Sequence, residues 1–420
     1  MKSKQLSVFV TLIICAAGGA QAQSLVKSSP GFHYFHKDGA GMERHDADLV
    51  ACALATRALV NGSDATTGIA ASTGGGLLPA LVGGIIDSNE ERQGAAANTE
   101  NCMALHGWSV IGLSKEDGRA MEEPSDAATI HAKLAPLVEA PEPGGSVLRG
   151  PFANELAVGG FKVKEAGDLE EVSMSVRATR DIAKAAVDEV GDLKPAKPPK
   201  GVKAPKPAKL FKGEDLAIAD PAKSYLVLRL VGSKVDLRST SIGLKRLASD
   251  GTEVVYDGAV TATFMGGSSR TVGKGEEGDD RYYDYVVGLP PGMWKLATIN
   301  YSIYTANLCF GAPAFELKQG ETLFLGVMKL SDAGGYPLDG ANLNVAKEIL
   351  ASAPALADKV KSPEFTNGFT SDCFGSYAYA YEIPDAPFVD KTALKDAAAA
   401  SGAMEDTNPS NGSQADSRGE

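Results

Sequence analysis

The chain has 420 residues, of which 44% are hydrophobic and 22% are charged, and its formal charge at pH 7 is -12. This much apolar side chain can bury a core, so the composition excludes a wholly disordered protein. The acidic balance argues against a general nucleic-acid binder, which needs a broad basic surface to displace counterions. We therefore expect a folded protein of two or three domains with no nucleic-acid partner.

Residues 1–22 have the pattern of a signal peptide. Two lysines precede an apolar run, Leu6–Ala17, that is too short to span a bilayer. Ala20-Gln21-Ala22 then matches the small-x-small pattern that precedes a cleavage site. We expect cleavage there and export to the periplasm or the outer membrane. The alternatives are an uncleaved anchor and a lipoprotein signal at Cys15, which the bulky Ile14 disfavours.

Cleavage leaves an even number of cysteines, which in an oxidising compartment predicts disulfides. These are Cys52, Cys102, Cys309 and Cys373. They fall into two groups on either side of a proline-rich stretch, so we expect the pairs Cys52–Cys102 and Cys309–Cys373. Each bridge would contribute about 4 kcal/mol in the chain-entropy model. Metal binding is the alternative, and the lack of a Cys-x-x-Cys pair disfavours it.

Two helices are expected in residues 23–113, over residues 43–60 and 89–106, with Gly107 as a left-handed cap after the second. Between them, residues 65–86 carry no charge and place small residues three and four positions apart. Such residues let helix backbones approach closely. We expect a helical hairpin clamped by Cys52–Cys102, with the glycine-rich segment packed against it. Membrane insertion of this segment is the alternative, which Pro79 disfavours.

A sequence motif runs through the same region. It comprises Tyr34-Phe35, Gly39, Asp46, Asp48-Leu49 and Cys52, then the glycine-rich segment, then Asn101-Cys102-Met103 and His106-Gly107-Trp108. Over residues 33–113 this pattern resembles uncharacterised envelope proteins of Gram-negative bacteria, and its ending is similar to that of small glycine-zipper outer-membrane lipoproteins. The resemblance implies an envelope location and no known chemistry.

Residues 114–193 predict a mixed helical extension with a helix over 181–190, and residues 194–212 form a linker rich in lysine and proline. Its prolines favour polyproline II, whose three residues per turn match the spacing of the lysines. All the ammonium groups would then lie on one face. They belong to Lys194, Lys197, Lys200, Lys203, Lys206, Lys209 and Lys212. This lysine stripe is either a solvated spacer or a binding surface for lipid head groups or an acidic polysaccharide.

From Ser224 the hydrophobic period changes to two, in short runs bounded by Gly, Asp and Pro. This pattern predicts an antiparallel β-sandwich over residues 220–390, with hairpins at Asp250-Gly251 and Gln319-Gly320. A helix is expected over Val345–Leu350, and residues 391–420 are expected to be a disordered tail. The motif Leu289-Pro290-Pro291-Gly292, with Gly320-Glu321 and Gly326 further on, resembles transthyretin-like accessory domains of bacterial envelope proteins.

Two groups of side chains are candidates for chemistry. His33, His36 and His45, with Asp46, have spacings at which imidazoles can share a metal, although histidines in a polar arm are usually solvated. The acidic loop 273–280 either binds calcium or is a solvated hairpin tip. An acid pair for glycoside hydrolysis would come from Asp279, Asp280 and Asp284, although the sequence shows no aromatic cleft or partner pattern beside them.

We therefore predict an α+β multidomain protein, with an N-terminal disulfide-clamped helical hairpin and a C-terminal antiparallel β-sandwich. Its predicted role is that of a non-catalytic structural or interaction protein of the cell envelope, without a cofactor. The glycine-rich segment would associate it with the outer membrane, and its partners would be a membrane surface, an anionic envelope polymer or a protein. The alternative is a secreted hydrolase or metal-dependent enzyme that uses the acidic loop or the N-terminal histidines.

Overall fold

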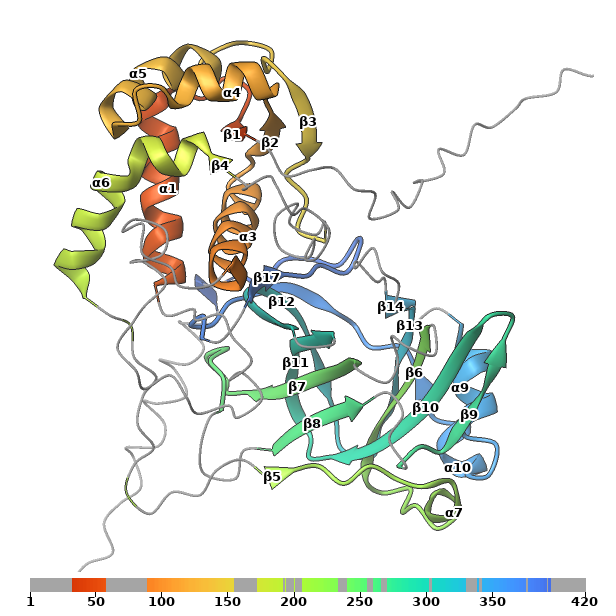
Figure 1. The fold of residues 1–420 in the computed structure, drawn as a ribbon. Coiled ribbons are helices and arrows are strands. Elements are labelled where there is room, and N and C mark those ends of the chain that lie inside the picture. Colours follow the sequence, from red (N-terminus) through yellow and green to blue (C-terminus); the bar gives the residue numbers. More distant parts are fainter. Residues whose placement is uncertain are drawn as a thin grey trace, which may run out of the picture.

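The computed structural model describes residues 32–57, 89–154, 172–191, 193, 200, 206–232, 240–254, 260–265, 270–301, 304–329, 338–339, 342–374, 377–390 and 392–393. The predicted signal peptide, the glycine-rich segment and all of the predicted C-terminal tail except residues 392–393 lie outside these ranges. Within them the chain is an α+β structure with three mostly antiparallel sheets (Figure 1).

The N-terminal half is built around a four-stranded sheet with the order β3-β2-β1-β4. Its strands are β1 (Phe32–His36), β2 (Ser109–Gly112), β3 (Ser146–Arg149) and β4 (Val172–Ser173). β1 is antiparallel to β2 and parallel to β4. Successive strand residues point to opposite faces, and both Tyr34 and Phe35 are buried, so the sheet is covered on both sides.

Helices pack around this sheet. They are α1 (Met42–Thr56), α3 (Asn89–Leu105), α4 (Lys115–Glu122), α5 (Ala127–Val138) and α6 (Met174–Val190). The last three begin at Ser114, Asp126 and Ser173, whose side chains each accept a hydrogen bond from a backbone N–H of the first turn. The helices predicted over 43–60 and 89–106 are present as α1 and α3, and the helix predicted over 181–190 is the second half of α6.

The hairpin prediction was incomplete, because the sequence does not reveal the four-stranded sheet. Its strands have two to five residues, too few to establish a period of two. Nor do residues 114–193 form a separate extension: Ile130 and Met174 are buried in the same hydrophobic cluster as Trp108. The N-terminal half is therefore one α+β unit. Within it the predicted disulfide Cys52–Cys102 joins α1 to α3.

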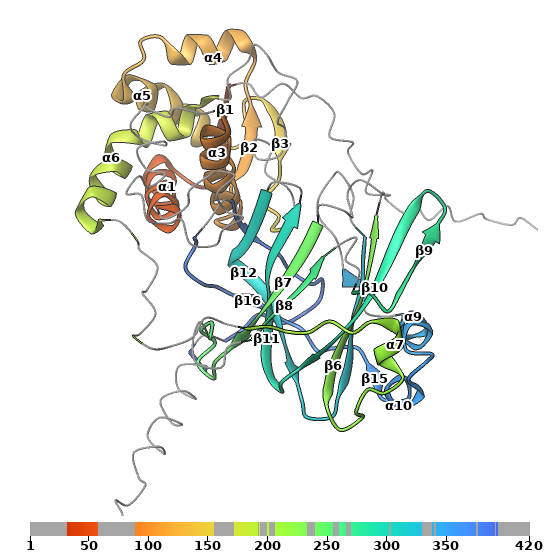
Figure 2. The ribbon, with the colours of Figure 1, turned by 60° about the horizontal axis from the view of Figure 1, so that its bottom comes forward.

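The C-terminal half contains a six-stranded and a seven-stranded sheet (Figures 1 and 2). The first has the main order β14-β13-β6-β10-β9 and consists of β6 (Ser224–Gly232), β9 (Gly273–Glu277), β10 (Asp280–Leu289), β13 (Thr322–Lys329), β14 (Leu338–Asp339) and β15 (Val360–Lys361). The second has the main order β16-β12-β11-β7-β8-β5 and consists of β5 (Lys206–Pro207), β7 (Thr240–Leu247), β8 (Val260–Met265), β11 (Gly292–Tyr301), β12 (Tyr304–Leu317), β16 (Thr366–Phe369) and β17 (Tyr377–Ala380).

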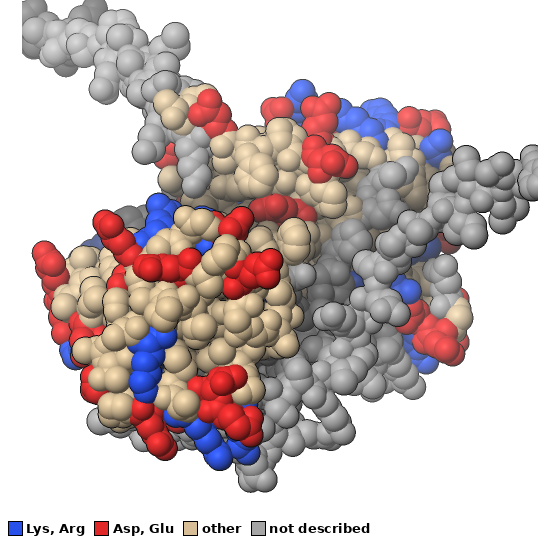
Figure 3. Space-filling model, turned by 90° about the horizontal axis from the view of Figure 1, so that it is seen from above, with Lys and Arg blue, Asp and Glu red and all other residues tan. Residues whose placement is uncertain are grey.

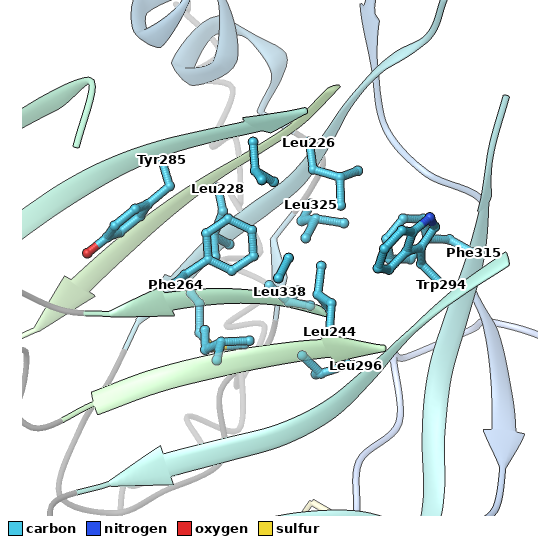
Figure 4. Packing of buried hydrophobic residues seen from close by; sticks show 14 of the residues in the cluster. Leu226, Leu228, Leu244, Phe264, Tyr285, Trp294, Leu296, Phe315, Leu325 and Leu338 are labelled. Atoms are coloured by element: carbon cyan, nitrogen blue, oxygen red, sulfur yellow. The ribbon is translucent and has the colours of Figure 1, made fainter. Parts of the chain in front are cut away.

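Both sheets contribute side chains to one hydrophobic cluster. Leu226 and Leu228 come from the first sheet, and Leu244 and Trp294 come from the second (Figure 4). Burial of this cluster is the main stabilising contribution in this half, because the hydrophobic effect scales with the apolar area removed from water.

Two details of the β prediction were wrong. The sheets are mostly but not wholly antiparallel: β13 runs parallel to both β6 and β15 in the first sheet, and β17 runs parallel to β12 in the second. The turn at Gln319-Gly320 is present, with Gly320 in a left-handed conformation, but it connects β12 to β13, which belong to different sheets. Local sequence specifies that a chain turns and does not specify which strand it then pairs with. The Asp250-Gly251 turn does bring the chain back, because Leu247 bridges to Glu253.

Three short helices belong to this half: α7 (Gly213–Leu216), α9 (Leu343–Ile349) and α10 (Pro354–Ala357). α9 corresponds to the helix predicted over 345–350. It is fastened to the first sheet by Arg229, which binds Asp284 through two hydrogen bonds of 2.6 and 3.0 Å and reaches Glu348 of α9 at 3.3 Å. The second predicted disulfide, Cys309–Cys373, joins β12 to the segment that precedes β17.

The two halves are joined where α3 meets β17. Asn98 accepts a hydrogen bond from the backbone N–H of Ala378 at 2.7 Å, and Asn101 donates one to the carbonyl oxygen of the same residue at 2.8 Å. A third asparagine, Asn154, donates a hydrogen bond to the carbonyl oxygen of Glu382 and accepts one from the backbone N–H of the same residue. Because β17 pairs with β12 on one side, these side-chain amides supply partners for backbone groups on its other side.

We predict that Asn98→Ala destabilises the protein by about 1–3 kcal/mol, because it leaves the buried N–H of Ala378 without this acceptor. Urea unfolding followed by circular dichroism measures the change. Asn344→Ala, at an exposed position of α9, is the matched control and should change the unfolding free energy by less than about 0.5 kcal/mol. Equal effects of the two substitutions would show that the hydrogen bond across the junction contributes nothing.

Candidate functional site

The lysine stripe reaches the folded C-terminal half at β5. Lys194, Lys197 and Lys203 lie outside the described residues, and Lys200, Lys209 and Lys212 are exposed. Lys206 belongs to β5, which pairs with β8, and Leu210 is buried and bridges to Val287 of β10. The end of the predicted linker is therefore docked on the sheets.

A cavity of about 590 Å³ lies where this segment meets the sheets, and we call it the linker pocket. Its walls come from four parts of the chain. They are Lys209–Phe211 after β5, residues 215–225 from α7 to the start of β6, the turn Gly288–Pro291 between β10 and β11, and Gln319. Phe211 and Tyr225 meet edge to face within it, with ring centroids 5.6 Å apart. A mostly apolar pocket of this size with a few polar groups is typical of a ligand site.

The polar groups of the linker pocket are mixed in sign. Lys209 and Lys223 line it together with Asp215 and Asp220. Within the described part of the chain, neither lysine has an ion-pair partner. Tyr225 donates its hydroxyl hydrogen to the carbonyl oxygen of Asp220 at 2.9 Å. Burial raises the pKa of Tyr225, and the negative charge of Asp220 raises it further, so the phenol stays neutral.

The three candidate histidines do not come together as one site. His33 and His36 are buried on β1, and because they are three residues apart in a strand they point to opposite faces. A ring nitrogen of His36 lies 2.8 Å from the carbonyl oxygen of Ala140. His45 belongs to α1 and binds elsewhere. These histidines are thus core residues with local partners and not members of a solvated arm.

His45 is the centre of a network that the sequence does not reveal. Its Nε2 lies 2.8 Å from the hydroxyl of Ser175 on α6, and its Nδ1 lies 3.0 Å from Asp46. His131 of α5 binds the other oxygen of Asp46 at 2.8 Å. Burial alone would raise the pKa of Asp46, but the hydrogen bonds from the two histidines lower it below its ordinary value.

The hydrogen bonds run from the serine hydroxyl of Ser175 to the imidazole of His45 and on to the carboxylate of Asp46, as they do in a Ser-His-Asp catalytic triad. However, Ser175 and His45 are both fully buried, and the hydroxyl oxygen of Ser175 also accepts the backbone N–H of Phe35 at 2.9 Å. A nucleophile must reach its substrate, and this hydroxyl is enclosed by the core. The network therefore satisfies polar groups between α1, α5, α6 and β1.

The acidic loop belongs to the β9–β10 hairpin, in which residues 273–277 form β9 and residues 278–279 form the turn. Two of its acids have separate partners. Glu276 pairs with Arg281 at 3.0 Å, and Asp280 pairs with Lys329 at 3.2 Å. Asp284 is buried against Arg229, so Asp280 and Asp284 do not face a common substrate position. On the face shown in Figure 3, acidic and basic side chains are likewise interspersed.

A second arrangement not revealed by the sequence lies on β11. Lys295 is only 1% exposed, and its ammonium lies 2.6 Å from Glu253 and 3.1 Å from the hydroxyl of Ser371. Serine–lysine pairs act as nucleophiles when the lysine is neutral. Burial lowers the pKa of Lys295, but the carboxylate of Glu253 opposes this shift and favours the charged ammonium, which has no lone pair to accept the serine proton. Burial opposes ionisation of Glu253, but the charges of Lys295 and Lys245 lower its pKa to about 2.

Comparison with protein-family models, with curated proteins and with solved structures gives no match. Among the described residues, no helix is long and apolar enough to cross a membrane.

We predict that Glu253→Gln destabilises the protein by about 3–5 kcal/mol at pH 7, because it leaves the ammonium of Lys295 buried without its counter-charge. The folded-state pKa of Glu253, about 2, lies below its ordinary value of 4.5, so its contribution is present above pH 4.5 and is lost as the pH falls towards 2. Urea unfolding between pH 7 and pH 3 should therefore show a smaller loss of stability for this variant than for the wild type.

The control for this experiment is Glu316→Gln, since Glu316 is exposed and forms only a 3.7 Å contact with Lys318. We expect this variant to follow the wild-type pH dependence. A Glu253→Gln variant that did the same would contradict the assignment.

Proposed function

We propose that this chain is an exported, non-catalytic interaction protein of the cell envelope that binds an anionic lipid surface at the linker pocket. The observation that carries the proposal is the position of Lys209, a member of the lysine stripe, in the wall of a cavity that also contains Lys223. In this proposal the two sheets of the C-terminal half form a β-sandwich that holds the pocket rigid.

An exposed apolar side chain at the pocket supports a membrane surface as the partner. Ile218 lines the linker pocket and is 83% exposed, more than the other large hydrophobic residues that are described. An apolar side chain beside lysines is the combination by which proteins attach to the interface of a bilayer. The lysines attract lipid phosphates, and the apolar group enters the boundary between head groups and acyl chains.

Nearby acids limit the strength of this attraction. Glu214, Asp215 and Asp220 lie among the same residues as Lys209, Lys212 and Lys223. The pocket alone therefore has little excess positive charge, and the excess comes from the rest of the lysine stripe. Binding should accordingly weaken as salt rises, because screening reduces the interactions between exposed charges.

We predict that Lys209→Gln with Lys223→Gln weakens binding to vesicles of phosphatidylcholine and phosphatidylglycerol by roughly 30-fold, at about 1 kcal/mol for each lysine near an anionic surface. Vesicle sedimentation at fixed salt measures the affinity. Asp215→Asn should act in the opposite direction and strengthen binding, since it removes a negative charge from the pocket wall.

The matched control is Lys184→Gln with Lys347→Gln, which removes the same charge at exposed positions on α6 and α9. This control should bind the vesicles like the wild type. Equal losses in the two double variants would mean that net charge and not the linker pocket governs binding. If the wild type binds a soluble acidic polysaccharide but not the vesicles, the lipid proposal fails.

A further inference from the structure

Four side chains with metal-binding chemistry converge between α1 and α3. Asp48 and Cys52 are one turn apart on α1, and Cys102 and His106 have the same spacing at the end of α3. Residues four apart on a helix lie on one face, so each helix presents a pair to the other. The two cysteines are bonded to each other, and Nδ1 of His106 lies 3.3 Å from Asp48.

The three softer donors of this group are already close together. A ring nitrogen of His106 and the two sulfur atoms all lie within 4.8 Å of one another. Among the described residues no comparable group surrounds Cys309–Cys373, so the arrangement is not a general property of the disulfides in this chain. Two thiolates and an imidazole are a ligand set that zinc prefers, with the fourth position left for water or a further ligand.

The surroundings hold this group in place. Asp48 is fixed through its second oxygen, which accepts hydrogen bonds from Trp108 at 2.9 Å and from Arg44 at 2.8 Å. A carboxylate that fixes a histidine is the usual outer partner of a zinc-bound imidazole. Both cysteines are buried in the N-terminal core, whereas the side chain of His106 is 35% exposed and gives a metal ion access from solvent.

We propose that reduction of Cys52–Cys102 converts this group into a zinc site made of the two thiolates and His106, with Asp48 positioning the imidazole. The reductant is a dithiol, which transfers two electrons and two protons to the disulfide and becomes a disulfide itself. Binding of Zn²⁺ then releases the two thiol protons and forms two zinc–sulfur bonds. In the oxidised form the sulfurs are bonded to each other and the site is closed to metal.

Cobalt titration of the full chain tests this proposal, because Co²⁺ bound by thiolates absorbs in the near ultraviolet and, when tetrahedral, in the visible. The protein is reduced with a phosphine without oxygen, and circular dichroism monitors its fold. The reduced wild type and the variant Cys309→Ser with Cys373→Ser should both bind one Co²⁺ with this spectrum. The variant Cys52→Ser with Cys102→Ser should not.

Two further variants separate this site from a bare pair of thiols. His106→Ala should lower cobalt affinity by more than about tenfold, and Asp48→Asn should lower it by about 10–100-fold, the range for loss of an outer partner. The proposal is wrong if the reduced wild type shows no thiolate–cobalt absorption, whether it stays folded or not. It is also wrong if His106→Ala binds cobalt like the wild type.

Discussion

The structure depends on α3, which holds the two halves of the chain together. In its last two turns Cys102 is bonded to α1, and Asn98 and Asn101 are hydrogen-bonded to the backbone of Ala378 in β17. Near them Arg149 of β3 lies 3.1 Å from Glu100, and both side chains are almost fully buried. A buried ion pair requires that its partners stay in place, because separating them leaves an uncompensated charge in the core. α3 is therefore attached both to the N-terminal half, through Cys102 and Glu100, and to β17 of the C-terminal half.

The two proposed sites lie at different distances from this fixed helix. The linker pocket is lined by residues that follow β5, by residues of α7 and by the turn between β10 and β11, and α7 lies at the end of the C-terminal half away from α3 (Figure 1). The proposed zinc site, formed by Cys52, Cys102 and His106, lies at the end of α3 itself. Because α3 holds the two halves together, the C-terminal half can present the proposed lipid-binding surface while the N-terminal half keeps its structure. The formal charge of -12 describes neither place, since lysines mix with acids at the pocket and the Glu100–Arg149 pair at α3 is buried.

Local patterns predicted much of the fold. The period of two located β6, β10 and β13, helical spacing located α1 and α3, and the grouping of cysteines around the prolines gave both disulfides. The N-terminal sheet was missed because its strands are very short. The parallel pairing of β13 with β6 was missed because a local sequence pattern identifies a strand but does not indicate which other strand it pairs with. Among candidate site residues, spacing singled out the seven lysines, of which Lys209 lines the linker pocket, whereas His131 and Ser175 are separated from His45 by long stretches of chain and share no motif with it.

Native-state hydrogen exchange in increasing urea tests most directly whether α3 makes the two halves one cooperative unit. Mass spectrometry would compare peptides from α1, in the N-terminal half, with peptides from β6, in the C-terminal half. We predict that both lose protection at the same urea concentration, because the asparagine hydrogen bonds between α3 and β17 couple them. Loss of protection in one half while the other stays fully protected would contradict this account.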